Sequence, residues 1–377
     1  MIYFDNNATT PVIPEVKEAM APFLGDLYGN PNSIHQQGTK TRAAIEKSRG
    51  VIAKILGARP SEIVFTGSGT ESNNQALVGT MIPLIPNGGN LVISSLEHAS
   101  VRVTGQWLAE RFGFELRIAP FKIKNGEVDP QPFIDLIDEN TRLVSVMAAN
   151  NETGVIMPVR AIFAAARSAG ALCHSDCVQG VGKLNIDVAQ LGVDLLSFSA
   201  HKIHGPKGCA GLFVRRGLKL DPLVHGGPQE NGRRAGTENV TNIVGLGEAL
   251  RVAQDTGTDG VMQIRDYFEE RIAELGERVM INFKDFPRTP NVSSVCFKGM
   301  DGNVLVIKLD RKGICVSTGA ACNSGALSAS RGLLAAGLSE VDAAATIRFS
   351  FSKLNTREEV DEFMLALTAV LPGRTRA

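Results

Sequence analysis

Seven short apolar segments recur in the first 216 residues, and stretches with helical spacing, such as residues 101–112 and 159–168, separate them. This alternation is typical of a sheet of mostly parallel strands with helices on both faces. We therefore predict an α/β fold built on a seven-stranded, mostly parallel sheet. The expected strands are residues 62–66, 91–95, 115–119, 143–149, 171–176, 195–200 and 211–216.

The last third of the chain predicts a second, smaller unit. A long charged helix over 261–279 leads to further apolar segments and to a final helix over 357–371. With 377 residues, of which 44% are hydrophobic, the chain is long enough for two domains and a sizeable core. We expect a large domain over residues 15–258 and a smaller α+β domain formed by residues 1–14 and 259–377.

Charge and cysteine content argue against several classes of function. Lys plus Arg and Asp plus Glu each number 39, so nothing in the charge favours nucleic acid or an anionic membrane as the main partner. The N-terminal residues lack the basic and apolar regions of a signal peptide, and no run reaches the ~18 apolar residues of a membrane-spanning helix. Six scattered cysteines in so long a chain do not form a secreted disulfide framework. We expect a cytoplasmic protein.

Reactive polar groups follow two of the predicted strands. Ser199, His201 and Lys202 come after the apolar segment 195–198, and Asp176 ends the strand before it. Ligands of such sheets bind at the carboxyl ends of the strands. A lysine there is usually a solvated loop residue, but Lys and Asp at one edge fit pyridoxal 5′-phosphate. That cofactor takes a covalent link from the lysine and a carboxylate beside its pyridine nitrogen.

Residues 65–74 supply a turn suited to a phosphate group. Gly69 and Thr70 lie in it between a predicted strand and a stretch able to form a helix, so backbone N–H groups and hydroxyls gather at a helix N-terminus. Many strand-to-helix turns have this composition, and this one lacks both the P-loop lysine and the full dinucleotide fingerprint. Beside Asp176 and Lys202, it predicts the site of the cofactor phosphate.

Cys322 lies in a segment of small residues, 316–325, without the periodicity of a helix or a strand. A structural cysteine normally has branched apolar neighbours, whereas flanking Gly, Ala and Ser suit a loop that delivers a nucleophile. A lone cysteine is more often a packing residue. The functional interpretation of Cys322 therefore depends on the site predicted around Lys202.

Cys173, His174 and Cys177 raise the question of a metal site. Because the side chains of a strand alternate, Cys173 and Cys177 would face one side of the sheet, and His174 and Asp176 the other. We interpret both cysteines as packing residues and predict no metal site. The same interpretation applies to three cysteines in or near apolar segments, Cys209, Cys296 and Cys315.

With these features the chain resembles the cysteine desulfurases that supply sulfur for iron–sulfur clusters, within the class V aminotransferase family of fold type I pyridoxal phosphate enzymes. The Ser-Ala-His-Lys block at 199–202 is typical of the family. The small-residue segment around Cys322 separates desulfurases from the aminotransferases and kynureninase-like relatives. The resemblance covers nearly the full chain, with matching blocks at residues 5–11, 96–100, 150–155, 175–179, 226–240 and 346–350.

The resemblance implies a set of cofactor-binding residues. Lys202 would bond covalently to the cofactor, Asp176 would pair with its pyridine nitrogen, and Gln179 would hydrogen-bond its phenolic oxygen. His98 would stack on the ring and assist proton transfer, although a core histidine is its default interpretation. The phosphate would be bound by Gly69, Thr70, Ser199 and His201 of one subunit and by Thr237 of the other.

The resemblance also implies the residues that handle the substrate. Asn151, which would also contact the cofactor, and Arg348 would hold the substrate carboxylate, Arg348 with the bidentate geometry of a guanidinium. Cys322 would be the nucleophile that receives the sulfur. Three positions, Gly69, Ala320 and Asn323, depart from the commoner family pattern without loss of a functional group.

The implied activity is removal of sulfur from L-cysteine, which gives L-alanine and a persulfide on Cys322. Cys322 would pass the sulfur to an acceptor protein such as an iron–sulfur scaffold, and Thr237 implies a homodimer with shared sites. The pathway that uses the sulfur stays open between cluster assembly, tRNA thiolation and DNA phosphorothioation. A transient contact of Cys322 with an iron–sulfur cluster also stays open. Two alternative functions also remain. A transaminase or selenocysteine lyase would not need Cys322, and a non-catalytic assembly partner would not need Lys202 or Asp176.

Overall fold

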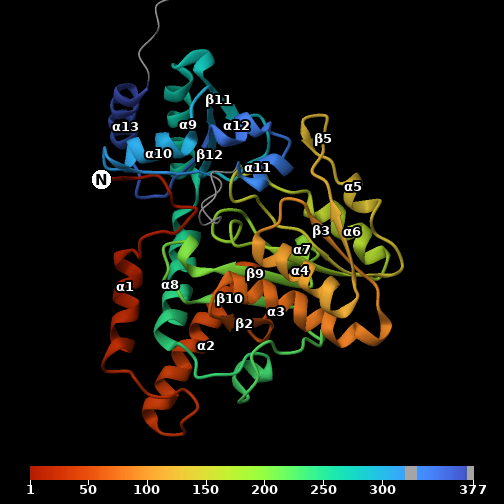
Figure 1. Cartoon of the computed structure of the whole chain (residues 1–377). Helices are drawn as coiled ribbons and strands as arrows, with labels where there is room; N and C mark the ends of the chain where they lie inside the picture. Colours follow the sequence, from red (N-terminus) through yellow and green to blue (C-terminus); the bar gives the residue numbers. More distant parts are fainter. Residues whose placement is uncertain (319–328, 372–377) are drawn as a thin grey trace, which may run out of the picture.

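The protein folds around two main sheets, as its computed structural model shows for residues 1–318 and 329–371 (Figure 1). The larger sheet has the strand order β2-β10-β9-β8-β7-β3-β4. β10 runs antiparallel to both of its neighbours, whereas the other pairs are parallel. The predicted seven-stranded, mostly parallel sheet is confirmed. Its strands are β2 (Ile63–Thr66), β3 (Asn90–Ser94), β4 (Glu115–Ala119), β7 (Thr141–Ser145), β8 (Leu172–Asp176), β9 (Leu195–Ser199) and β10 (Ala210–Val214).

The reversal at β10 follows from the length of its connection to β9. The linking segment between Ser199 and Ala210 has about ten residues, which is too few for the helical crossover that a parallel pair needs. The chain therefore turns back after the 3₁₀ turn Ala200–Lys202 and places Ala210 opposite Ser199. This pairing fixes the end of β9 at the turn that carries Lys202.

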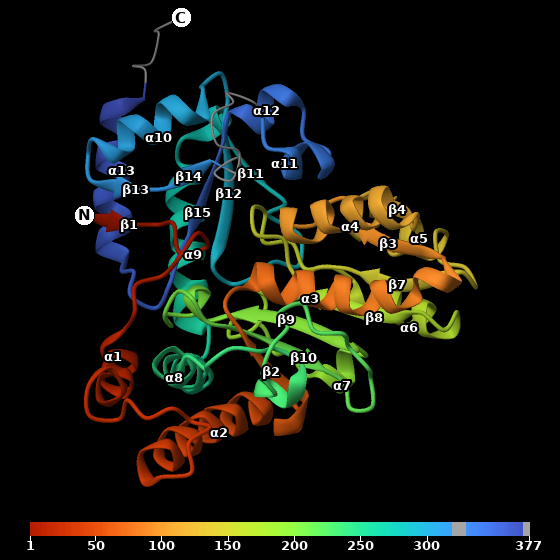
Figure 2. The same ribbon diagram turned by 60° about the horizontal axis from the view of Figure 1, so that its bottom comes forward.

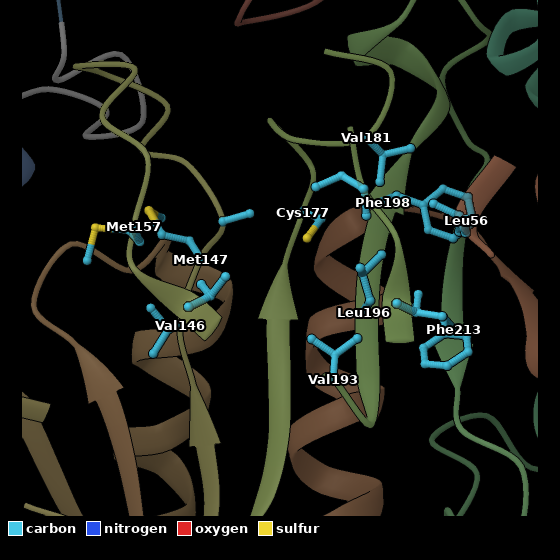
Figure 3. Close-up of a cluster of buried hydrophobic side chains, with 14 of the residues drawn as sticks. Leu56, Val146, Met147, Met157, Cys177, Val181, Val193, Leu196, Phe198 and Phe213 are labelled. Carbon is cyan, nitrogen blue, oxygen red and sulfur yellow. The ribbon is translucent and has the colours of Figure 1, made fainter. Parts of the chain in front are cut away.

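Helices cover both faces of the larger sheet (Figure 2). Consecutive residues of one strand enter opposite cores, because side chains alternate along a strand. In β9, Leu195 packs on the core that α3 and α4 share, and Leu196 packs on the core of α2, α6 and α8 (Figure 3). Burial on both faces explains why these strands are continuous apolar runs. The helices are α2 (Gln36–Leu56), α3 (Gly69–Met81), α4 (Ala99–Phe112), α6 (Val159–Ser168) and α8 (Val240–Thr256).

Two of these helices begin at the carboxyl edge of the sheet with a side-chain cap. The Ser68 hydroxyl accepts from the backbone N–H of Glu71 at the start of α3. The His98 ring accepts from the backbone N–H of Ser100 at the start of α4. A cap satisfies one of the N–H groups that have no partner inside a helix. Both helix N-termini therefore lie beside the strand ends where the sequence predicts a site.

The smaller sheet is antiparallel, with the order β11-β12-β15-β14. The predicted helix over 261–279 is wrong at its C-terminal end, because α9 stops at Ala273. Gly276 has a φ of 63°, the left-handed conformation that ends helices, and β11 starts three residues later. The elements are α9 (Asp259–Ala273), β11 (Val279–Asn282), β12 (Val292–Phe297), α10 (Gly302–Asp310), β14 (Ser317–Thr318), β15 (Thr346–Ser350) and α13 (Arg357–Val370).

The N-terminal residues pack against this second sheet. β1 (Ile2–Tyr3) pairs in parallel with β13 (Ile314–Cys315), and Phe4 belongs to the same core as residues of α9, α10 and α13. The ring of Phe4 lies 5.0 Å from that of Phe351 and 6.4 Å from that of Phe268. The domain boundaries given above stay a prediction.

Short elements complete the part of the chain that the structure describes. No helix within residues 1–318 or 329–371 has the length and apolar character to cross a membrane. The remaining elements are α1 (Pro14–Met20), β5 (Ile123–Lys124), β6 (Glu127–Val128), α5 (Gln131–Ile134), α7 (Val188–Leu191), α11 (Arg331–Ala335) and α12 (Glu340–Ala344).

Phe268→Ala should destabilise the protein more than any change on the exposed side of α9. The Phe268 ring is fully buried, with its centroid 4.6 Å from that of Phe349 and 5.5 Å from that of Phe363. Removing such a ring leaves a cavity and costs about 3–5 kcal/mol of unfolding free energy. Urea unfolding measures this loss. The matched control, Met262→Ala on the same helix at a side chain 40% exposed, should change the free energy by less than about 0.5 kcal/mol. Equal losses for both variants would contradict this packing.

Candidate active site

A cavity of about 370 Å³ lies at the carboxyl ends of the parallel strands and beside the N-termini of α3 and α4. Its size is within the range of small-molecule sites. Thr237 is not among the described residues that line it, because it is exposed on the segment before α8, and Cys322 lies outside the described residues. The predicted residues that line it are Gly69, Thr70, His98, Asn151, Asp176, Gln179, Ser199, His201, Lys202 and Arg348.

Lys202 lies on the 3₁₀ turn after β9, where the N-terminal segment crosses the edge of the sheet. Its Nζ donates to the carbonyl oxygen of Asn7 at 2.6 Å and to that of Ala8 at 2.8 Å. The carbonyl of the preceding residue, His201, accepts from the backbone N–H of Thr10 at 2.9 Å. The N-terminal segment and the turn after β9 are therefore bonded to each other. The Lys202 amine is bound by neutral carbonyl groups that a ligand can replace.

Asp176 ends β8 with both carboxylate oxygens occupied. Oδ1 accepts from the backbone N–H of Val178 at 2.9 Å, and Oδ2 accepts from Asn73 Nδ2 at 2.7 Å. These bonds fix the rotation of the carboxylate at the wall of the cavity.

Asn73 extends this network to His98. Its Nδ2 also donates to Ser100 Oγ at 2.9 Å, and Ser100 Oγ lies 2.8 Å from His98 Nδ1. Because His98 Nδ1 also accepts from the backbone N–H of Ser100, this nitrogen carries no proton, and a neutral ring has its proton on Nε2. Neither Asn73 nor Ser100 was predicted from the sequence to have a role. The one available signal for Asn73 is its position one helical turn after Gly69, on the same face of α3.

The start of α3 forms a close-fitting cradle. A Cβ atom on Gly69 would lie 2.7 Å from Val178 Cγ2, so the backbone approaches this wall more closely than a larger residue permits. The first N–H groups of a helix attract anions. Burial, with a smaller effect from the charge of Lys202, lowers the pKa of His201 to about 4, so its ring is neutral at physiological pH. A phosphate group fits the donors of this corner.

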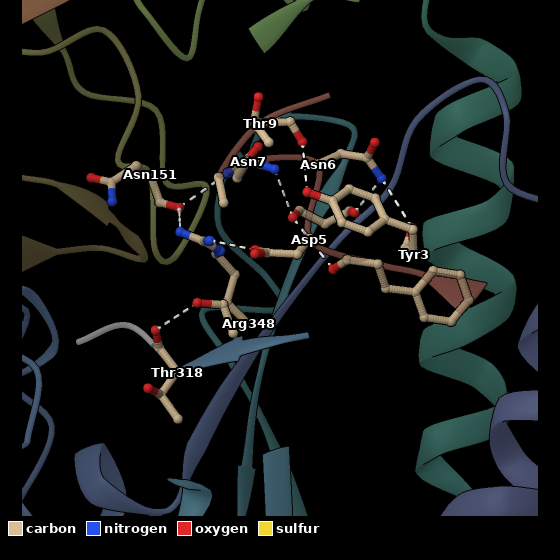
Figure 4. Close-up of polar contacts among 12 residues, drawn as sticks. Tyr3, Asp5, Asn6, Asn7, Thr9, Asn151, Thr318 and Arg348 are labelled. Carbon is tan, nitrogen blue, oxygen red and sulfur yellow. Dashed lines mark hydrogen bonds and ion pairs between the residues drawn. The ribbon is translucent and has the colours of Figure 1, made fainter. Parts of the chain in front are cut away.

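Arg348 comes to the cavity from the second sheet. Its neighbours Ile347 and Phe349 pack in the core, so alternation along β15 turns the arginine toward the site. Nη2 donates to Asp5 Oδ1 at 2.7 Å, and Nη1 donates to the carbonyl of Asn151 at 3.2 Å (Figure 4). Its buried Nε has no hydrogen-bond partner among the described residues. The guanidinium thus keeps donor capacity for a carboxylate.

Two buried carboxyl groups near the cavity were missed by the sequence analysis. Burial, and then the charge of Asp176, raises the pKa of Glu97 well above its usual range. Burial also raises the pKa of Glu152, whose carboxylate accepts from the hydroxyl of Ser330. Ser330 caps α11, so this bond ties the start of that helix to the residue that follows Asn151.

The cysteines of the large sheet are buried, as predicted for packing residues. Cys173 and Cys177 belong to one hydrophobic core, and burial raises the pKa of each to about 12. Such thiols stay protonated and are poor nucleophiles. His174 lies between Ser145 Oγ at 2.8 Å and Ser197 Oγ at 3.1 Å. Burial lowers the pKa of His174 to about 3, so its ring is neutral.

Comparisons with known proteins agree with this geometry. The family model described as aminotransferase class-V matches residues 2–363. A protein of Dictyoglomus turgidum named cysteine desulfurase IscS is 40% identical over 373 residues, which cover 98% of this chain and 94% of that protein. A solved structure named NifS-like protein has 37% identity and a TM-score of 0.90, with 98% of each chain covered. The structure of SspA in complex with cysteine has 35% identity and a TM-score of 0.83, covering 93% of this chain and 99% of that one.

Acid should destabilise the protein partly through His174. The folded protein keeps this ring neutral down to about pH 3, whereas the unfolded chain binds a proton near pH 6.5, so stability falls as the pH drops below 6.5. This one group should account for about 1.5 kcal/mol between pH 6.5 and 5. His174→Gln should therefore flatten the dependence of unfolding free energy on pH, measured with guanidinium chloride. The exposed His225→Gln serves as the control and should leave the slope as it is. An unchanged slope in His174→Gln would refute the assignment.

Proposed function

The chain belongs to the cysteine desulfurases of the class-V aminotransferase family, and from this premise we propose that its cavity binds pyridoxal 5′-phosphate and L-cysteine. The observation that carries the proposal is the placement of Asp176 and Lys202 on the wall of one cavity at the N-terminus of α3. A carboxylate, an amine and a helix N-terminus match the pyridine nitrogen, the aldehyde and the phosphate of this cofactor.

The residues around the cavity have the chemistry that this cofactor needs. Asp176 is oriented by Val178 and Asn73 and would hold the pyridine nitrogen in its protonated form. Once bound, the cofactor withdraws electrons from the substrate carbon. The remaining contacts that we propose are a phosphate site made by Gly69, Thr70, Ser199 and His201, and contacts with the rest of the cofactor by His98, Asn151 and Gln179.

Lys202 and His98 are the proton-handling groups in this proposal. Lys202 would exchange the carbonyl oxygens of Asn7 and Ala8 for the cofactor, and its amine would then carry a proton from the substrate carbon. His98 has Nδ1 bonded to Ser100, so a neutral ring carries its proton on Nε2 and would donate it from there. The two groups line the same cavity and would work on neighbouring atoms.

Arg348 and Asn151 would select the substrate by its carboxylate. The guanidinium is held by Asp5 through Nη2 and by the carbonyl of Asn151 through Nη1, and each of these nitrogens has a second N–H to donate. An arginine with a fixed fork binds a carboxylate with two parallel hydrogen bonds. We expect these residues to orient L-cysteine with its α-carbon toward Lys202.

Cys322, outside the described residues, is proposed as the sulfur acceptor. Its thiolate would attack the substrate sulfur, so that an S–S bond forms as the C–S bond breaks. The electron pair of the C–S bond stays on the carbon fragment, which takes up a proton and leaves as L-alanine. The persulfide on Cys322 then passes sulfur to an acceptor protein, such as a scaffold for iron–sulfur cluster assembly. Because this chemistry needs reduced thiols, we propose the cytoplasm as its location.

A homodimer with shared sites would complete the phosphate site. Thr237 lies on an exposed segment that an ion pair of 2.9 Å between Arg234 and Glu71 holds beside the start of α3. On the same chain, the large side chains Tyr28 and Ile34 are 79% and 99% exposed. In the proposed dimer a second copy would bring Thr237 to the other subunit's phosphate.

Cys322→Ser should separate cofactor chemistry from sulfur transfer. The variant should bind pyridoxal phosphate and show a spectral change when L-cysteine is added, because Lys202 and Asp176 are intact. It should form neither alanine nor labelled persulfide, because a hydroxyl does not replace a soft thiolate. Radiosulfur transfer from labelled L-cysteine, mapped by peptide, measures the outcome.

The matched control for this experiment is Cys315→Ser, at a half-buried thiol on β13. It should transfer sulfur as the wild type does. Undiminished alanine production by Cys322→Ser would refute the desulfurase mechanism and favour a lyase. Label on a cysteine other than Cys322 in the wild type would reassign the nucleophile.

Mixing Lys202→Ala and Thr237→Val subunits should restore activity if the sites are shared. One site of each heterodimer then carries both defects and the other carries neither, so random mixing gives about a quarter of the wild-type activity. The assay is alanine formation after subunits are exchanged, with each parent variant alone as the baseline. Activity equal to the mean of the two parents would contradict a shared site, as would an active monomer in sedimentation.

A further inference from the structure

Lys183 lies behind the wall of the cavity, on the segment that follows β8. It lines a second cavity together with Lys202 and Asn291, whereas Gln179 and Asn7 line the candidate active site. Lys183 Nζ donates to Gln179 Oε1 at 2.6 Å and to Asn7 Oδ1 at 3.0 Å. Lys183 therefore influences the candidate active site through the side-chain amides of Gln179 and Asn7.

An amide side chain has an acceptor end and a donor end, and its partners decide which way it faces. For Gln179, the Lys183 ammonium offers donors alone, so Oε1 must face it. At the other end, Nε2 donates to the carbonyl oxygen of Asn7 at 3.1 Å, and a carbonyl oxygen is an acceptor alone. A flipped amide would place donor against donor and acceptor against acceptor. The second hydrogen of Nε2 is thereby left for the cavity that Gln179 lines.

The same ammonium orients the side chain of Asn7. Asn7 Oδ1 accepts from Lys183 and, at 2.9 Å, from Asn291 Nδ2, so Asn7 Nδ2 points the other way and donates to the carbonyl of Asn151 at 3.0 Å. The carbonyl oxygen of Asn7 is the one that receives both Gln179 and Lys202. Lys183 thus fixes a residue that also positions the reactive lysine.

Burial lowers the pKa of Lys183 well below its usual range, and the charges of Lys202 and Arg348 add to the lowering. Both hydrogen bonds can form with the ammonium or with the neutral amine, which still has two N–H groups, but only the ammonium offers donors alone. Other ionisable groups near it are His201 and His204, which also sense the charge of Lys183. Burial makes the charge of Lys183 costly, so its role in this structure lies in the hydrogen bonds that it donates to Gln179 and Asn7.

We propose that Lys183 is a positioning residue that orients the amide of Gln179, so that the site presents an N–H donor to an anionic oxygen of the bound ligand. The inference rests on the proposed function, in which that oxygen is the phenolic oxygen of pyridoxal phosphate. An N–H donor there favours the deprotonated form of the cofactor. Without Lys183 the amide can turn, and its carbonyl oxygen would then repel the same oxygen.

The test is the pH titration of the visible absorption of the bound cofactor. In Lys183→Met the midpoint should rise by about half a pH unit or more, because the donor is no longer held. Gln179→Leu should raise it by at least as much, and the double variant should match Gln179→Leu alone, because Lys183 acts through Gln179. Lys183→Arg keeps a donor-only cation and should restore the midpoint. The control Lys353→Met, at a lysine lining the same second cavity, should leave it unchanged.

The result that overturns the proposal is a midpoint in Lys183→Met equal to that of the wild type. A further rise in the double variant above Gln179→Leu also overturns it, because Lys183 would then act directly by its charge. Thermal unfolding of the cofactor-free protein reports whether Lys183→Met folds. If it does not, Lys183→Gln is the substitute variant: it retains an N–H donor and should raise the titration midpoint by a smaller amount. An unchanged midpoint in Lys183→Gln counts against the proposal. A wild type that binds no pyridoxal phosphate when titrated with it refutes the proposed function instead.

Discussion

Asn7 joins the two sheets at the candidate active site through its backbone and its side chain. Its N–H donates to Ser350 Oγ on β15 at 2.8 Å, and its carbonyl oxygen accepts from Lys202, which follows β9. Its side chain meets Lys183 and the carbonyl of Asn151. Each buried donor or acceptor left without a partner costs about 1–3 kcal/mol, so a change at this residue would disturb groups from both sheets. The geometry of the site depends on this N-terminal crossing.

Groups of both charges surround the cavity. Arg348 is paired with Asp5, and Lys202 donates to the neutral carbonyl groups of Asn7 and Ala8. Asp176 is held by N–H groups of neutral residues, so its charge is not cancelled by a neighbouring arginine or lysine in those contacts. A ligand with a phosphate, a carboxylate and a basic ring nitrogen therefore meets a complementary group at each of its polar ends.

Burial gives the cysteines of the large sheet a different character from the thiol that the mechanism requires. Cys173, Cys177 and Cys209 have pKa values raised to about 12 by burial, and a thiol that stays protonated does not attack sulfur. The apolar cores that stabilise the sheet thus also keep these thiols inert. Cys322, among small residues in the sequence, remains the proposed nucleophile.

The sequence by itself determined the seven strands and the placement of Asp176 and Lys202 at one edge, because apolar periodicity is local and parallel strands end on the same side of a sheet. It did not determine where α9 ends, which depended on the conformation of Gly276. Only the tertiary structure decided the partners of Asn73 and Lys183. Asn73 meets Asp176 across 103 residues of sequence, and Lys183 meets Asn7 across 176. A polar residue in the sequence carries no sign of its distant partner, since packing of separate segments chooses which donors and acceptors meet.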